Sequence, residues 1–289
     1  MNDRKTGTRE WSEHSVNCCL GCRHGCLYCY ARANATRWGR IADPADWTVE
    51  RPFDQATALA NRRFKGVVMF PTTHDITPLA GADLGTLEAC VRTLYALLRA
   101  GNRVLIVSKP HRAVIGRLCE FLRPWRDGEQ VEFRFSIGTL SEELAAFWEP
   151  GAPPIAERID ALAHAFAAGY ATSVSAEPLL DCLPLAAESL VEAVEPWVRE
   201  TIWIGCMNKI AQRTAWWRQP RRYEVLTDHE ARIRELEAEI TRLKAGYGPV
   251  NLRLIHRRLG HNPNVRWKDS IQQVLGVDAE GRPAEPGNG

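Results

Sequence analysis

Five of the chain's nine cysteines fall within twelve residues near the N-terminus, in the stretch CCLGCRHGCLYCYAR that begins at Cys18. Thiolates bind soft metals, and iron–sulfur clusters are held by several cysteines of a short loop. The spacing C-x3-C-x2-C makes Cys22, Cys26 and Cys29 the expected metal ligands. A cuboidal cluster held by only three thiolates keeps one iron free for another molecule, so the loop predicts an open coordination site.

Cys18 and Cys19 complicate this assignment, because Cys18, Cys22 and Cys26 are also regularly spaced. Only the later triad has the x2 spacing and a tyrosine beside a ligand. We therefore expect Cys18 and Cys19 to be small, partly buried side chains, with an auxiliary ligand role as the alternative.

Disulfide bonds or a zinc site would also account for a large number of cysteines. The N-terminal sequence MNDRKTGTREW is polar, and no run approaches the about 18 apolar residues that span a bilayer, so a cytoplasmic protein with no membrane association is expected. In that reducing compartment disulfides seldom persist.

Zinc sites usually combine two close ligand pairs, whereas the other cysteines stand singly. A non-enzymatic zinc-binding module stays the alternative. The single cysteines are Cys90, Cys119, Cys182 and Cys206.

The rest of the chain alternates short apolar runs with amphipathic stretches, which is typical of βα units with a parallel sheet. The expected strands are residues 66–70, 103–108, 131–138, 171–179 and 200–205. The expected helices are residues 84–98, 112–122, 156–168 and 186–194. With one more strand just before the cysteines, the pattern predicts an α/β fold, a partial (β/α)6 barrel of the TIM type.

The pattern changes near residue 211. Residues 211–270 contain thirteen Lys and Arg against seven Asp and Glu, and aromatic side chains lie among them. Arginines neutralise phosphates and aromatics stack on bases, so nucleic acid is one expected partner; a solvated basic face with tryptophans in the core is the alternative. The aromatics are Trp216, Trp217, Tyr223 and Trp267. The expected domains are a core barrel (1–210), a basic helical C-terminal extension (211–277) and a disordered tail (278–289).

The segment CRHGCLYC, with an aromatic residue before its last cysteine, resembles the cluster motif of the radical S-adenosylmethionine (SAM) enzymes. The resemblance implies an enzyme with a 4Fe-4S cluster whose unique iron chelates the amino and carboxylate groups of S-adenosyl-L-methionine. An electron, from a reductant such as flavodoxin or ferredoxin, would cleave SAM to methionine and a 5′-deoxyadenosyl radical that abstracts a hydrogen from the substrate. The protein's part is to position these groups and exclude water.

Residues 11–210 resemble, in order, the spore photoproduct lyase-like branch of that superfamily, which includes phage-associated proteins of unknown substrate. CLYCY matches the tyrosines on both sides of the branch's third cysteine, which implies that Tyr28 and Tyr30 lie against the cofactor. The DNA-repairing lyases carry a hydrogen-donating cysteine after the second strand, and PTTHD has none. The resemblance therefore extends to the cofactor chemistry and not to a repair substrate.

Other matches fall at the ends of successive strands, where barrel active sites are built. FPTTHD matches the polar residue and aspartate that meet the methionyl amine, which implies His74 and Asp75. VSKP matches the lysine that meets the methionyl carboxylate, which implies Lys109. Ser136 matches a cofactor-contacting serine. Two further cofactor contacts are expected after later strands: Glu177 and Asn208.

The segment EPGAPPIAER after the serine strand resembles the branch's E-P-x-x-P and arginine segment, and we expect Glu149 and Arg158 to form a structural ion pair. The substrate is left open between three classes. A nucleic acid or nucleotide follows from the branch and the basic region; a protein or small metabolite is the first alternative, and the zinc-binding module without catalysis is the second.

Overall fold

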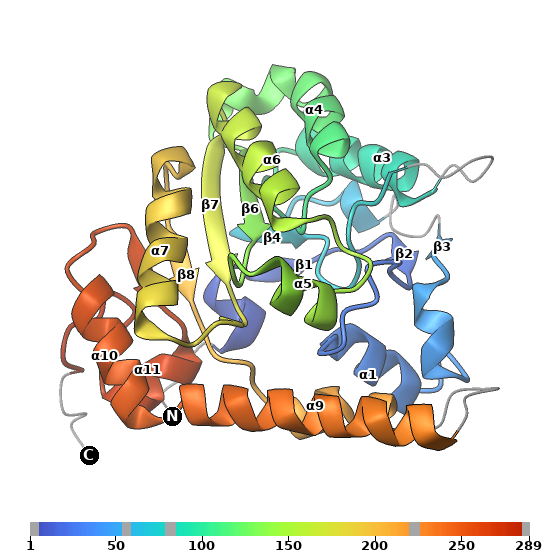
Figure 1. Cartoon of the computed structure of the whole chain (residues 1–289). Helices are drawn as coiled ribbons and strands as arrows, with labels where there is room; N and C mark the ends of the chain where they lie inside the picture. Colours follow the sequence, from blue (N-terminus) through green and yellow to red (C-terminus); the bar gives the residue numbers. More distant parts are fainter. Residues whose placement is uncertain (1–5, 54–58, 79–84, 220–225, 285–289) are drawn as a thin grey trace, which may run out of the picture.

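The computed structural model describes residues 6–53, 59–78, 85–219 and 226–284. In these ranges the chain forms a parallel sheet in the order β1-β4-β5-β6-β7-β8-β9 (Figure 1). The spatial order follows the chain order, and among the described residues the edge strands β1 and β9 do not pair with each other. The expected α/β fold with a partial barrel is therefore confirmed. The strands are β1 (His14–Ser15), β4 (Val67–Phe70), β5 (Arg103–Ser108), β6 (Val131–Ser136), β7 (Ala171–Ala176), β8 (Ile202–Ile204) and β9 (Val265–Trp267).

Helices connect the successive strands and cover the sheet (Figure 1). They are α1 (Tyr30–Arg37), α3 (Gly85–Arg99), α4 (Arg112–Phe121), α5 (Glu142–Trp148), α6 (Ile155–Ala167), α7 (Pro184–Val194), α8 (Ile210–Arg213), α9 (Leu226–Gly246), α10 (Pro249–Leu259) and α11 (Asp269–Leu275). Short 3-10 helices occupy Gly7–Glu10, Pro44–Thr48, Arg123–Gly128, Glu195–Trp197 and Ala215–Arg218. None of the described helices is long and apolar enough to cross a membrane.

The core lies between the sheet and its covering helices. Side chains on both faces of the central strands are buried, as in Val104, Leu105 and Ile106 of β5. This explains why these segments are apolar at neighbouring positions rather than alternating, because each face of a parallel sheet is covered. The strand carboxyl ends point away from α4 and towards α5 and α9 (Figure 1).

The region from residue 211 is largely helical, as expected, and it also contributes β9, which the sequence did not predict. β9 pairs in parallel with β8, so this region completes the sheet. Its three residues include Arg266 and are followed by Lys268, so they have no apolar run of their own. The segment 278–284, expected as part of a disordered tail, is hydrogen-bonded: the amide of Trp267 donates to the Ala279 carbonyl at 2.8 Å. Residues 285–289 of that tail lie outside the described residues.

The helix α9 runs across the end of the molecule at which the strands finish (Figure 1). The indole Nε1 of Trp148 on α5 donates to Glu239 Oε2 of α9 at 3.1 Å, and Arg242 Nη2 donates to the Leu180 carbonyl at 2.9 Å. A helix remote in sequence therefore covers the side of the barrel on which a site at the strand ends would lie.

Candidate active site

A cavity of about 780 Å³ lies at the carboxyl ends of the strands, and residues expected at the cofactor site line it. They are Cys22, Cys26, Cys29, Tyr28, Tyr30, His74, Asp75, Lys109, Ser136 and Glu177. Asn208 is not among the lining residues and is exposed, whereas its neighbour Lys209 lines the cavity. The structure therefore brings to one cavity the segments between residues 22 and 177 whose resemblance to the radical SAM motifs was found separately for each segment.

The backbone of the cysteine loop is held from two sides. β2 (Cys19–Leu20) pairs with β3 (Arg51–Pro52), and the Cys22 amide donates to the Trp47 carbonyl at 2.8 Å. Gly21 has φ +96° there, and a Cβ at this position would lie 2.2 Å from the Val49 carbonyl oxygen. Only glycine combines this close approach with a left-handed conformation.

The opposite side of the loop rests on the end of α5. The Leu27 amide donates to the Trp148 carbonyl at 2.8 Å, and the Gly151 amide donates to the His24 carbonyl at 2.9 Å. The loop is therefore a fixed part of the barrel mouth.

The thiol of Cys29 lies at the N-terminus of α1, where its Sγ accepts the Arg32 amide at 3.4 Å. Burial is the main effect on the other two thiols, and it raises the pKa of Cys26 to about 12 and that of Cys22 well above its usual value. Without a bound metal these two groups are neutral, so metal binding must displace their protons.

The spacing of the three thiols suits a polynuclear cluster better than one metal ion. Two thiolates bound to one zinc ion, at about 2.3 Å each, can lie no more than about 4.6 Å apart. The Sγ atoms of Cys22, Cys26 and Cys29 are not gathered within 4.8 Å of one another, although another group of described residues is. The three thiols are therefore spaced more suitably for a polynuclear cluster than for a single zinc ion.

The guanidinium of Arg32 supports the same conclusion. It is buried and stacks on Trp216, with its central carbon 3.8 Å from the ring centroid. Its Nε and Nη1 have no hydrogen-bond acceptor among the described residues. Burial lowers the pKa of Arg32, and negative charge at the three cysteines opposes this effect. A buried cation with unused donors beside three thiols fits an anionic cluster.

The carboxylate of Asp75 is surrounded by donors. Ser108 Oγ and the Ile76 amide donate to Oδ1, the Lys109 amide donates to Oδ2 at 2.8 Å, and His24 Nδ1 lies 3.3 Å from Oδ2. Burial alone would raise the pKa of this carboxyl, but His24, Lys109 and Ser108 outweigh burial and hold the pKa below its usual range. Asp75 therefore stays charged and fixes the start of the loop after β5.

The ammonium of Lys109 projects into a second buried network. Its Nζ lies 3.7 Å from Glu149 Oε1 and 5.6 Å from the centre of the Tyr28 ring. The Tyr28 hydroxyl donates to Glu149, and Arg158 pairs with the same carboxylate. The expected Glu149–Arg158 ion pair is confirmed. Burial would raise the pKa of Glu149, but Lys109 and Arg158 outweigh it and lower the pKa.

Glu177 connects the cavity to both chain ends. Its Oε2 lies 3.4 Å from Lys268 Nζ, and that ammonium also lies 2.9 Å from Glu10 Oε1 and donates to the Gly7 carbonyl at 2.7 Å. Lys268 is buried over the Trp11 ring. Burial raises the pKa of Glu177 although Lys268 opposes this effect.

The remaining expected residues have protein partners as well. The Tyr30 hydroxyl donates to the Thr72 carbonyl. His74 uses both ring nitrogens, since Nε2 accepts the Cys18 amide at 3.1 Å and Nδ1 donates to the Asp75 carbonyl at 2.9 Å. Ser136 ends β6 at the cavity wall.

Cys18 and Cys19 are buried and do not line the cavity. Burial raises the pKa of Cys19 to about 12. The pKa of Cys18 is lowered to about 5, chiefly by its hydrogen bond with the Cys90 thiol, in spite of burial. The two neighbours thus have different surroundings.

The aromatic residues of the basic region are mostly used for packing. Trp267 is buried, Trp216 donates its Nε1 to the Leu27 carbonyl at 3.1 Å, and Trp217 lies under Arg232. Tyr223 lies outside the described residues.

The cavity residues that sequence reasoning missed include three that can carry a positive charge: His24, Lys209 and Arg213. His24 lies inside the C-x3-C spacing, and its position beside the first two ligands was the available signal. The other two follow β8 and depend on the turn at Lys209, a left-handed residue with φ 55°.

No protein-family model matches the chain. The chain is 29% identical over 179 residues to the uncharacterized protein ORF301 of Acidianus two-tailed virus, across 57% of this chain and 55% of that protein. Among solved structures it is similar to Streptococcus suis SuiB bound to S-adenosylmethionine, with 12% identity and a TM-score of 0.47, across 91% of this chain and 48% of that one. The chain spans about half the length of each of these proteins.

The substitution Glu149→Gln tests the buried network. It leaves the Arg158 and Lys109 charges without their carboxylate and should lower the free energy of unfolding by about 3–5 kcal/mol. Glu143→Gln, at an exposed position on α5, is the matched control and should cost less than about 1 kcal/mol. Urea unfolding followed by tryptophan fluorescence measures both; equal stability of the two variants would contradict the role given to Glu149.

Proposed function

We propose that this protein is a radical SAM enzyme, which reductively cleaves S-adenosyl-L-methionine to form a 5′-deoxyadenosyl radical for hydrogen abstraction. One observation supports this most: the C-x3-C-x2-C thiols and the polar groups at the strand ends line the same cavity of about 780 Å³. That volume suits a small-molecule cofactor and part of a substrate. The lyase-like branch of the superfamily remains part of the proposal on the sequence matches.

In this proposal Cys22, Cys26 and Cys29 hold a 4Fe-4S cluster, which supplies the electron for SAM cleavage when it is bound and reduced. Arg32 faces the thiolates and offsets their negative charge in a buried site. Metal binding requires that the thiols lose their protons, so assembly of the site is coupled to proton release.

The other residues orient SAM and keep water out. The Lys109 ammonium, held by Glu149 and next to the Tyr28 ring, is positioned to accept a carboxylate of the cofactor. Asp75 holds the Lys109 amide and the His24 ring in place. The α9 helix and the end of α5 close this side of the barrel and exclude solvent from a reactive radical.

Anaerobic reconstitution with iron and sulfide tests the cluster. The native chain should bind about four irons and four sulfides with a broad absorption near 400 nm, as expected of a cuboidal cluster. Cys26→Ala should lose this absorption and retain little iron. Cys119→Ala, a buried cysteine of α4 away from the cavity, should keep both. Zinc that binds to the native chain in place of iron and is lost in Cys26→Ala would instead favour the zinc-binding module.

The variant Asp75→Ala tests the cofactor site. It should retain the cluster but bind SAM about 10-fold more weakly or worse, because Asp75 positions Lys109 through the hydrogen bond from the Lys109 amide, and a hydrogen bond with a charged group contributes about 1.5–3 kcal/mol. Anaerobic calorimetry on the reconstituted protein measures the Kd. Asp160→Ala, whose carboxylate is exposed on α6, should leave the Kd unchanged. An unaltered Kd for Asp75→Ala would refute the role of this carboxylate.

For the substrate we propose a nucleic acid or nucleotide, with a protein or small metabolite as the alternative. Positively charged side chains support this proposal, because they can bind phosphate groups. Lys209 and Arg213 line the cavity, and Arg253 and Arg257 are exposed on α10. The tryptophans of the basic region add no support for nucleic-acid binding, because their rings pack against other parts of the protein. A flavodoxin or ferredoxin is the proposed electron donor.

Binding of a fluorescent single-stranded oligonucleotide at low salt tests this substrate class. The triple variant Arg213→Ala, Arg253→Ala, Arg257→Ala should bind more weakly and with a shallower dependence of log affinity on log salt, because fewer counterions are released. Arg103→Ala, exposed at the amino end of β5, is the control and should bind as the native chain does. Absence of binding to DNA and RNA would leave the protein or metabolite alternative.

A further inference from the structure

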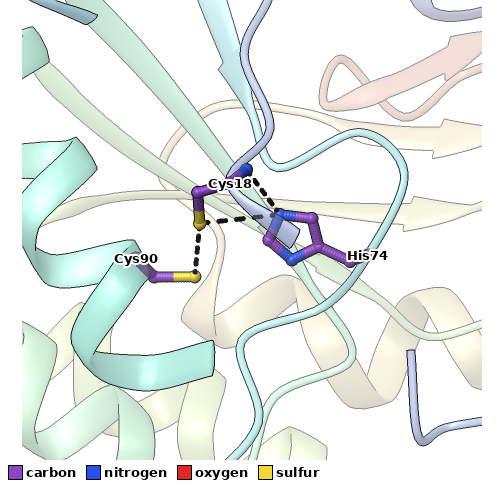
Figure 2. Close-up of side chains that lie close together, drawn as sticks. All are labelled: Cys18, His74 and Cys90. Carbon is purple, nitrogen blue, oxygen red and sulfur yellow. Dashed lines mark hydrogen bonds between the residues drawn. The ribbon is translucent and has the colours of Figure 1, made fainter. Parts of the chain in front are cut away.

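A second group of potential metal ligands lies outside the cavity's cysteine triad. Cys18, His74 and Cys90 are all buried, and their ligand atoms lie within 4.8 Å of one another (Figure 2). The Cys18 Sγ is 3.6 Å from the Cys90 Sγ and 3.8 Å from His74 Nε2. Figure 2 shows the two thiols and the imidazole pointing toward a common centre.

These distances match the coordination sphere of one metal ion. A tetrahedral ion with metal–sulfur bonds of about 2.3 Å and metal–nitrogen bonds of about 2.0 Å separates its sulfurs by about 3.8 Å, and a sulfur from a nitrogen by about 3.5 Å. Both observed separations lie within about 0.3 Å of these values. Two thiolates and an imidazole are also the donor types that zinc prefers.

The surroundings of His74 have the form found around metal-ligating histidines. Its Nδ1 donates to the Asp75 backbone carbonyl at 2.9 Å, which leaves Nε2 as an acceptor; this nitrogen accepts the Cys18 amide at 3.1 Å and lies 3.8 Å from the Cys18 Sγ. A backbone carbonyl on the far nitrogen is a common second partner of a metal-bound imidazole, since it sets the tautomer and the ring orientation. A Phe70 ring packs edge-on against the imidazole at 6.1 Å between centroids.

The three ligands come from three separate segments, of which only the one with His74 lines the cavity. Cys18 immediately precedes β2, which leads into the cysteine loop; His74 is in the loop after β4; Cys90 is on α3. An ion bound by all three would tie the His74–Asp75 segment to the first covering helix. Such a crosslink would fix the position of Asp75, although the ion itself would contact neither SAM nor the cysteine triad.

We propose that Cys18, His74 and Cys90 form a separate, structural site for one zinc ion. Binding requires both sulfurs as thiolates, so any proton that remains on the two thiols is released to solvent, and His74 Nε2 exchanges the hydrogen bond from the Cys18 amide for a bond to the metal. Three protein donors leave one position of a tetrahedral ion for a further ligand. The site does not depend on the proposed radical chemistry, and it would exist equally in a protein without SAM activity.

Cobalt titration of the full chain tests this site, because thiolate-bound Co²⁺ has charge-transfer absorption in the near ultraviolet. The titration uses the variant Cys22→Ser, Cys26→Ser, Cys29→Ser, so that the cavity triad cannot bind. One equivalent of Co²⁺ should bind and be displaced by one Zn²⁺. Adding Cys18→Ser or Cys90→Ser should weaken binding by more than about 100-fold. Adding Cys119→Ser, a buried cysteine outside both groups, should change nothing.

A second measurement covers the case in which the triple variant does not fold. Single variants of the otherwise native chain are loaded with Zn²⁺, desalted and analysed for metal. Cys18→Ser and Cys90→Ser should each retain one equivalent less than Cys119→Ser. Equal zinc in all three variants would overturn the proposal, as would a native mass lower by two hydrogens that maps to a Cys18–Cys90 disulfide.

Discussion

The buried carboxylate of Glu149 is the interaction on which the cavity depends. It binds the Arg158 guanidinium, accepts the Tyr28 hydroxyl and lies next to the Lys109 ammonium. These partners belong to α6, to the cysteine loop and to the end of β5. A charge buried this deeply is tolerated only with partners, so the three segments must come together for the chain to fold. The geometry of the cysteine loop and the placement of Lys109 are therefore consequences of one electrostatic requirement.

The two chain ends are joined to the same cavity by a second buried charge. Lys268 follows β9 and meets Glu10 near the N-terminus and Glu177 at the end of β7. Because α9 and β9 both belong to the basic C-terminal region, that region closes the strand-end side of the barrel and completes its sheet. Its tryptophans pack against the cysteine loop and the core, which explains their number without a role in base stacking.

The sequence predicted the parts of the fold that depend on local pattern. The apolar runs of β5 and β7 are visible because both faces of these strands are buried, and Lys109 and Asp75 were expected to lie near each other because parallel strands end at one edge. β9 was not predictable in this way, since its pairing with β8 comes from tertiary contact and Arg266 and Lys268 interrupt its hydrophobicity.

The site shows the same division between local pattern and distant contact. The spacing of the cysteines is local and was readable from sequence. The stacking of Arg32 on Trp216, the position of Lys268 beside Glu177, and the approach of Cys90 to Cys18 depend on contacts between distant segments. Asn208 was matched by its place after a strand, but the left-handed turn at Lys209 follows it and Asn208 remains exposed outside the cavity lining.

Formation of 5′-deoxyadenosine is the most direct test of the proposal that the cavity cleaves SAM. The reconstituted native chain is reduced with dithionite under anaerobic conditions, mixed with SAM, and analysed by chromatography and mass spectrometry. We expect 5′-deoxyadenosine and methionine from the native chain and none from the variant that lacks Cys26. Absence of 5′-deoxyadenosine from native chain that carries its full content of iron and sulfide, and that binds SAM, would contradict this proposal.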